Sequence, residues 1–99
     1  MLEQRKMTKE EAIALHDSKF WVNMTYKERA MFQMFESKLC MPFSIFQEAV
    51  EKTLGRPVWT HEFAFYGIKK ELLGDKEAPT FEEIVGLIPE EKRILVNAG

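Results

Sequence analysis

A threonine followed three residues later by a glutamate occurs at three places in this chain: Thr8–Glu11, Thr25–Glu28 and Thr80–Glu83. In such a capping box the threonine hydroxyl accepts a hydrogen bond from the glutamate N–H, and the glutamate carboxylate accepts one from the threonine N–H. Each box therefore satisfies two backbone donors that a helix start leaves free. Three such starts in 99 residues commit the chain to a mainly helical fold.

The spacing of apolar residues extends this prediction along the chain. We expect five helices, separated by short connectors, and the segment 20–22 forms a strongly apolar connector after the first of them. The expected helices cover residues 9–18, 25–39, 42–54, 60–73 and 80–87.

The third of these helices has the clearest boundaries. Pro42 suits a first helical turn because its missing N–H is not needed there, and Gly55 is a natural left-handed cap. Beyond it, residues 57–60 should be extended, and the β-branched content of residues 93–96 favours a second short strand that could pair with the first. The fold class predicted is a small, mainly α bundle of four to five short helices, with these two short strands as a possible addition.

Length and charge limit the classes of function. Ninety-nine residues allow a single domain over 1–99, of which 1–7 should be a flexible N-terminal tail. The net charge of −2 lacks the basic excess of a nucleic-acid binder, and no apolar run is long enough to span a membrane. The first residues lack the apolar core of a signal peptide, and a lone cysteine forms no internal disulfide, so we expect a cytoplasmic protein.

No complete catalytic or metal-binding set is evident. His61 and Glu62 begin like a zinc-protease helix, but position 65 is Phe where a second histidine would be needed. Cys40 ends an apolar stretch, where a cysteine usually behaves as a small buried hydrophobe. We therefore predict no catalytic residue, no metal ligand and no cofactor, and keep a metal-dependent or cysteine hydrolase only as the weakest alternative.

Arg56 and its neighbours form the main candidate binding site. Arg56 lies between a capping glycine and a proline, on a rigid segment beside Trp59, where a guanidinium could hold a phosphate or carboxylate. His61 and Tyr66 could complete a nucleotide-type site. The simpler interpretation is a structural Arg56 that binds carbonyl groups at the end of the third helix, and a histidine held at a helix cap.

Phe20 and Trp21 form a second candidate. Trp, Tyr and Arg are enriched at protein-binding hot spots, so these two side chains could join Arg56 and Trp59 in a contact surface. Packing in the core is the simpler explanation. Eight Phe, two Trp and six Met in so short a chain also predict a homo-oligomer or a protein partner.

Two segments carry a resemblance to a known family. Residues 39–43 (LCMPF) and 54–64 (LGRPVWTHEFA), with the intervening stretch 47–51, are similar to short, uncharacterised proteins of bacteriophages and prophages. The resemblance extends over residues 8–96 and implies a phage accessory protein in the cytoplasm of a bacterial host. It implies no activity and no catalytic residue.

Two functions follow as hypotheses. The first is non-catalytic binding that modulates or inhibits a host or host-defence protein. The second is the binding or sequestration of a nucleotide-type small ligand through Arg56, Trp59, His61 and Tyr66.

Overall fold

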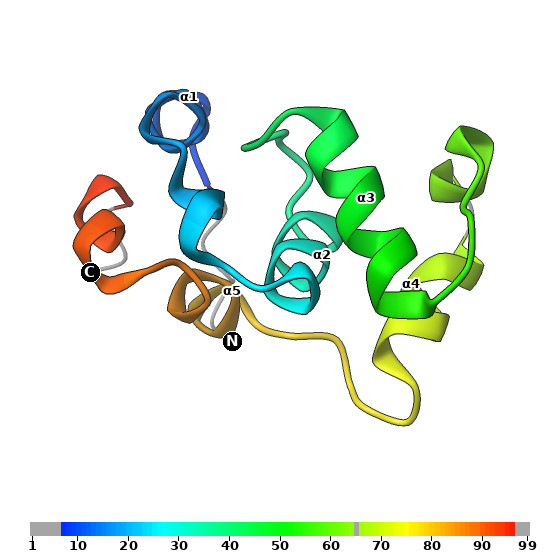
Figure 1. Ribbon diagram of the computed structural model, residues 1–99. Coiled ribbons are helices and arrows are strands. Elements are labelled where there is room, and N and C mark those ends of the chain that lie inside the picture. The colour runs from blue at the N-terminus through cyan, green and yellow to red at the C-terminus, as the bar shows by residue number, and fades with distance from the viewer. Residues whose placement is uncertain (1–6, 65, 97–99) are drawn as a thin grey trace.

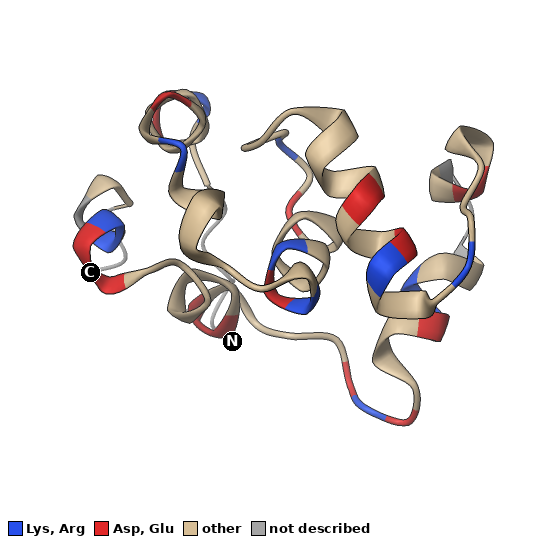
Figure 2. Ribbon diagram, viewed as in Figure 1, with Lys and Arg blue, Asp and Glu red and all other residues tan. Residues whose placement is uncertain are grey.

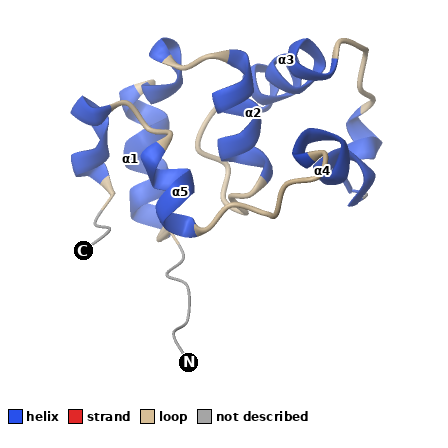
Figure 3. Cartoon of the chain, turned by 90° about the horizontal axis from the view of Figure 1, so that it is seen from below, coloured by secondary structure: helices blue, strands red, loops and turns tan. Residues whose placement is uncertain are grey.

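The computed structural model describes residues 7–64 and 66–96. For Ala64, Tyr66 and Ile94 it describes the backbone alone. Within these residues the chain forms five α-helices and three short 3-10 helices and no β-strand (Figures 1 and 3). The mainly α fold is thus confirmed. In chain order the elements are α1 (Lys9–Ser18), η1 (Phe20–Asn23), α2 (Tyr26–Met34), α3 (Phe43–Leu54), η2 (Thr60–Ala64), α4 (Tyr66–Leu73), α5 (Phe81–Gly86) and η3 (Glu90–Leu95).

All three capping boxes form. The Thr25 hydroxyl accepts from the Glu28 N–H at 3.1 Å while the Glu28 carboxylate accepts from the Thr25 N–H at 2.8 Å, and the boxes before α1 and α5 have the same two bonds. The helix starts are therefore fixed by local sequence. α3 follows Pro42 and ends at Gly55, whose φ of +73° is the left-handed conformation expected of a capping glycine.

The helices pack around α2. α3 lies along α2, α5 packs against α2 from the other side, and α1 contacts η3 near the C-terminus (Figure 1). At the opposite end of the molecule α4 contacts α3 and η2. The result is a flat body of about 36 × 34 × 20 Å, in which η2 and α4 form one end and α1 and η3 the other.

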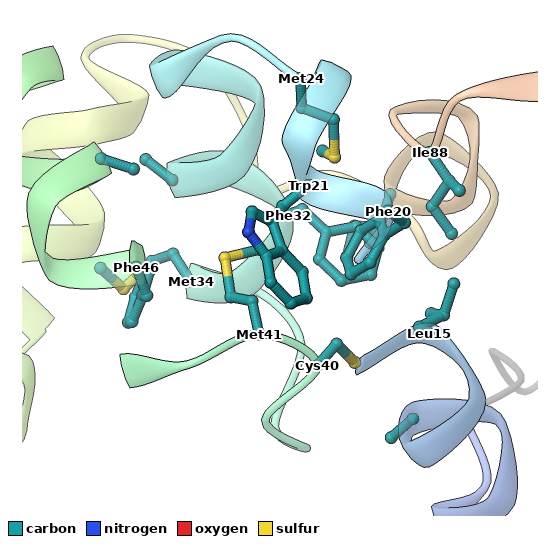
Figure 4. Packing of buried hydrophobic residues seen from close by; sticks show 14 of the residues in the cluster. Leu15, Phe20, Trp21, Met24, Phe32, Met34, Cys40, Met41, Phe46 and Ile88 are labelled. Carbon is teal, nitrogen blue, oxygen red and sulfur yellow. The ribbon is translucent and has the colours of Figure 1, made fainter. Parts of the chain in front are cut away.

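Aromatic and sulfur-containing side chains fill the core. Phe20 and Phe32 are fully buried and meet edge to face, with their ring centroids 5.0 Å apart, and Met41 and Leu15 lie in the same cluster (Figure 4). Among the residues that the structure describes, most of the aromatic and sulfur-containing side chains are buried in this way. Their number therefore does not by itself require an oligomer.

Neither predicted strand is present. Residues 57–59 are extended but pair with no other segment, and Thr60 already opens η2. Residues 93–95 belong to η3, because Pro89 starts a 3-10 turn and the Arg93 guanidinium donates to the carbonyl of Ile88 at 2.9 Å. Local turn formation outweighs the β-branched composition here.

α2 is shorter than the sequence pattern predicts, since it ends at Met34 instead of Leu39. The cause is the buried Gln33 side chain, whose amide nitrogen donates to the carbonyls of Glu36 (3.0 Å) and Lys38 (2.9 Å) while its oxygen accepts from the Cys40 N–H (2.8 Å). These three bonds supply partners that a helical backbone would otherwise provide, so the chain can leave the helix with the N–H of buried Cys40 and the carbonyls of Glu36 and Lys38 hydrogen-bonded.

The predicted helix over 60–73 is also divided. Its first part is η2 and its second part is α4, which begins at Tyr66. Gly67, the glycine within the predicted range, lies inside α4.

The tail predicted over 1–7 includes Met7, which the structure shows as a packed residue. Residues 1–6 lie outside the described part of the chain, but Met7 is buried at 1% exposure. Its Sδ lies 3.4 Å from the Cys40 Sγ, so Met7, the residue before the N-cap Thr8 of α1, is packed onto the loop between α2 and α3.

Candidate binding site around Trp59

The extended segment between α3 and η2 begins at the end of α3. The N–H groups of Gly55 and Arg56 both donate to the carbonyl of Glu51, at 2.8 and 3.3 Å, which closes the last turn of the helix. Pro57 then prevents the helix from continuing. The direction in which the chain leaves α3 is therefore set by its own capping bonds.

Val58 attaches this segment to α3. Its side chain is buried, its N–H donates to the Glu51 carboxylate at 2.9 Å, and its carbonyl accepts from the Gln47 amide at 2.8 Å. Gln47 and Glu51 are four residues apart and thus lie on one face of the helix. Both backbone groups of Val58 are therefore hydrogen-bonded by side chains of α3, which take the place of a neighbouring strand.

The backbone of Trp59 is also held by hydrogen bonds, here to Glu62 of η2. Its N–H donates to the Glu62 carboxylate at 2.8 Å, and its carbonyl accepts from the Glu62 N–H at 2.9 Å. Its side chain is nevertheless 71% exposed, the largest exposure among the large hydrophobic residues described. A well-held backbone thus presents a large indole to solvent.

Arg56 joins the segment to α4. Its guanidinium donates twice to the Glu71 carboxylate, at 2.7 and 3.1 Å, once to Glu62 at 3.2 Å and once to the carbonyl of Pro57 at 3.0 Å. Four of its five N–H donors are thereby used. We call Arg56, Glu62 and Glu71 the Arg56 clamp.

The clamp shifts the acid–base equilibria of its members. The hydrogen bonds that Arg56 donates to Glu71 and then to Glu62 raise the pKa of Arg56 further above its ordinary value. The pKa of Glu62 is lowered, first by the Trp59 N–H and then by Arg56, and the pKa of Glu71 is lowered by Arg56. All three groups stay charged at neutral pH.

The other predicted site residues differ in their placement. His61 is exposed on η2, next to Glu62. Tyr66 begins α4, but its side chain lies outside the described residues. Phe20 (1% exposed) and Trp21 (8% exposed) are core residues, so they offer no surface to a partner in the folded chain, and the simpler explanation of core packing accounts for them.

Cys40 lies in the loop before α3 and is buried against Met7. Burial, followed by the charge of Glu36, raises the pKa of its thiol to about 12. A thiol in this state is a poor nucleophile at neutral pH. Among the described residues no group of three or more His, Cys, Asp and Glu side chains is placed to hold a metal ion.

Sequence reasoning missed three residues of the site: Gln47, Glu51 and Glu71. The four-residue spacing of Gln47 and Glu51 on a predicted helix was an available signal for two side chains on a common face. No such signal points to Glu71, because its contact with Arg56 spans 15 residues and depends on the packing of α4.

Fold and site together define a small all-α protein whose most distinctive surface feature is an exposed, well-held tryptophan. The chain belongs to a family described as a domain of unknown function (DUF7736), whose model matches residues 26–81 and so covers α2, α3, η2, α4 and the start of α5. Neither the curated proteins nor the solved structures contain a match to this chain. No helix among the described residues has the length and apolar character that crossing a membrane requires.

Proposed function

We propose that this protein is a non-catalytic binding protein, and that Trp59 is the central residue of its contact with a partner protein. The observation that carries the proposal is the combination of 71% exposure of the indole with a backbone held at both its N–H and its carbonyl. Tryptophan is among the residues that contribute most to binding at protein interfaces.

The rigidity of the segment supports this function. A loop that must be ordered on binding lowers affinity, whereas a segment already held by Gln47, Glu51 and Glu62 avoids that cost. A surface tryptophan without a role would also be unfavourable, since exposed indole adds apolar surface in contact with water. The arrangement is therefore that of a preformed contact surface.

The alternative of a nucleotide-type ligand has weaker support. It requires Arg56 to bind a phosphate, but two carboxylates already occupy the guanidinium at distances of 2.7 to 3.2 Å. A phosphate would have to displace Glu71 and would meet the negative charge of both glutamates. The occupied guanidinium and the negative charge of the two glutamates therefore favour a protein partner over an anionic ligand.

The resemblance to phage and prophage proteins suggests the setting of this contact. In that setting the protein modulates or inhibits a host or host-defence component in the bacterial cytoplasm, without an enzymatic activity of its own. Alternatively, the same surface around Trp59 contacts a second copy of the chain in a homo-oligomer.

Affinity capture from the bacterial host tests the proposal. Wild-type protein and a Trp59→Ala variant are used as baits in parallel, with Val22→Ser as matched control because Val22 is 59% exposed on η1, at a different site. The proposal predicts that a partner is retained by wild type and by Val22→Ser and is lost with Trp59→Ala. Retention of the same proteins by all three baits would contradict it.

A further inference from the structure

An open hollow lies where η1 meets α2. Its wall is formed by Met24, Thr25, Tyr26 and Arg29, and its volume is about 360 Å³. This volume is near the lower end of the range found for small-molecule sites. Met24 is buried and supplies a thioether, whereas Tyr26 is 43% exposed and supplies an aromatic ring. The hollow shares no residue with the segment around Trp59.

The guanidinium of Arg29 is held in place at the wall of this hollow. Its Nε–H donates to the carbonyl of Trp21 at 2.8 Å, and its Nη2 donates to the carbonyl of Val22 at 3.4 Å. Its central carbon also lies 5.5 Å from the centre of the Tyr26 ring. These contacts orient the guanidinium in the absence of any ligand.

Arg29 nevertheless has free donors. A guanidinium carries five N–H groups, and two of them make the bonds to Trp21 and Val22, so three have no acceptor among the described residues. Arg56 is occupied by two glutamates, whereas no carboxylate in the described part of the chain forms an ion pair with Arg29. The planar fork of N–H groups in arginine matches the oxygens of a phosphate or carboxylate.

The charges of the two elements around the hollow are consistent with an anionic ligand. η1 carries no charged residue, and α2 carries Lys27, Glu28 and Arg29. Figure 2 shows these two basic residues and one acidic residue together in the first part of α2. The Glu28 carboxylate already accepts the Thr25 N–H at 2.8 Å in the capping box. Of the four lining residues, Arg29 is the one that carries a charge.

We propose that this hollow binds a small ring-bearing anion, whose phosphate or carboxylate accepts the free N–H groups of Arg29 while its ring lies against Tyr26. A volume of about 360 Å³ leaves room for one ring with its anionic group. The Tyr26 ring and the Met24 thioether supply the apolar contact that such a ring requires. This site is separate from the proposed contact at Trp59 and does not depend on it.

Nitrogen–proton NMR of the arginine Nε–H groups provides the test. An Arg29→Lys variant keeps the charge but removes the Nε–H group, and so assigns the Arg29 signal. Wild type is titrated with phenyl phosphate and benzoate, with inorganic phosphate and acetate as their ring-free counterparts, and with benzyl alcohol as an uncharged ring. We expect a saturable shift of the Arg29 signal with phenyl phosphate or benzoate, and the tighter of the two identifies the anionic group. The ring-free counterpart should bind about threefold or more weakly, and benzyl alcohol should cause no saturable shift.

Arg93 is an internal control in the same titration. Its Nε–H and Nη2 donate to the carbonyls of Ile88 and Gly86, at 2.9 and 3.1 Å, so it is anchored in the same manner as Arg29. Arg93 is exposed and is not one of the residues that line the hollow. Its signal should therefore stay unmoved when the Arg29 signal shifts.

Two substitutions at exposed positions of α2 test the role of the ring. Tyr26→Ala should weaken the binding of the ring-bearing anion about threefold or more, while the affinity for its ring-free counterpart changes little. Lys27→Gln removes a neighbouring positive charge that does not line the hollow, so it should change the affinity less than Tyr26→Ala does. Thermal melts establish that both variants are folded.

The inference would be overturned if the Arg29 signal showed no saturable shift up to the solubility limits of phenyl phosphate and benzoate, or if the Arg29 and Arg93 signals shifted equally. It would also be overturned by a saturable shift with benzyl alcohol, by equal affinities for the ring-bearing and ring-free anions, or by an affinity that Tyr26→Ala leaves unchanged. Each of these outcomes leaves the proposed contact at Trp59 untouched, because the two sites share no residue.

Discussion

The carboxylate of Glu62 accepts a hydrogen bond from the N–H of Trp59 at 2.8 Å, and the N–H of Glu62 donates to the carbonyl of Trp59 at 2.9 Å. This reciprocal pair gives the start of η2 a structure resembling a capping box, with the backbone of Trp59 at its centre. The backbone is thus held by the fold while the side chain takes no part in it. If Trp59 binds a partner, substitutions of its side chain should therefore weaken binding without lowering stability.

Trp59→Ala should leave the fold intact. Because the indole is 71% exposed, its removal should change the free energy of unfolding by no more than about 0.5 kcal/mol. Urea unfolding followed by circular dichroism measures this. As a contrast, Trp21→Ala removes a buried ring and should cost about 3–5 kcal/mol. A large loss of stability in Trp59→Ala would show that the indole is structural.

Arg56→Ala should lower the melting temperature, because it leaves Glu62 and Glu71 without their shared cation and removes the ion pairs that link η2 to α4. Arg56→Lys should recover only part of the loss, since an ammonium group does not reproduce the two parallel bonds to Glu71. Thermal melts of the three proteins decide this. An unchanged melting temperature in Arg56→Ala would free Arg56 for a ligand and revive the nucleotide alternative.

The contribution of the Arg56 clamp to the stability of the fold should decrease at acidic pH. The pKa values of Glu62 and Glu71 are lowered in the folded state, so their stabilisation is present above the ordinary glutamate pKa of 4.5 and is lost as the pH falls below it through the folded values. The difference in melting temperature between wild type and Arg56→Ala should therefore shrink as the pH falls from 7 into this range. A constant difference would indicate that Arg56 acts through packing alone.

Gln33 should be essential to the loop between α2 and α3. Gln33→Ala leaves the buried N–H of Cys40 and the carbonyl of Glu36 without the Gln33 amide, and leaves the Lys38 carbonyl with only the Cys40 thiol as donor, and should cost about 2 kcal/mol or more. Gln33→Glu should be at least as harmful, because a carboxylate cannot donate to those carbonyls. Denaturant unfolding measures both, with Ser37→Ala, an exposed position in the same loop, as the control. Costs within about 0.5 kcal/mol for Gln33→Ala would refute this role.

The Cys40 thiol should be unreactive in the folded protein. Its pKa of about 12 and its burial predict that a thiol reagent labels it near pH 8 only as fast as the chain opens, and far faster in denaturant. The folded state raises the pKa of the Cys40 thiol, so the neutral thiol contributes its full stabilisation of the fold below the ordinary pKa of 9.0. This contribution is lost as the pH rises from 9.0 towards 12. Comparing wild type with Cys40→Ala over that range isolates the effect. Rapid labelling of the native protein would contradict this description.

The features predicted correctly from sequence are those set by neighbours in the chain. The three capping boxes need only residues three apart, and the boundaries of α3 follow from Pro42 and Gly55. The failures depend on contacts made elsewhere. The early end of α2 depends on the Gln33 amide, and the absence of a strand near residue 95 depends on the bond from Arg93 to Ile88.

The site was predictable to a similar extent. Sequence reasoning placed Arg56 and Trp59 on one rigid segment, and the structure shows that segment held in place. It did not foresee that Arg56 would be occupied by carboxylates, because Glu71 reaches it only through the packing of α4. It also could not separate buried Phe20 and Trp21 from exposed Trp59, since all three are large aromatic residues in or beside connectors.

The most direct test of the central claim is site-specific photocrosslinking in the bacterial host. A photoreactive phenylalanine analogue replaces Trp59 in one variant and Val22 in another, since both side chains are more than half exposed. The account predicts that irradiation yields a discrete crosslinked product containing a second protein from position 59 and none from position 22. No product from position 59, or the same products from both positions, would contradict a partner contact at Trp59.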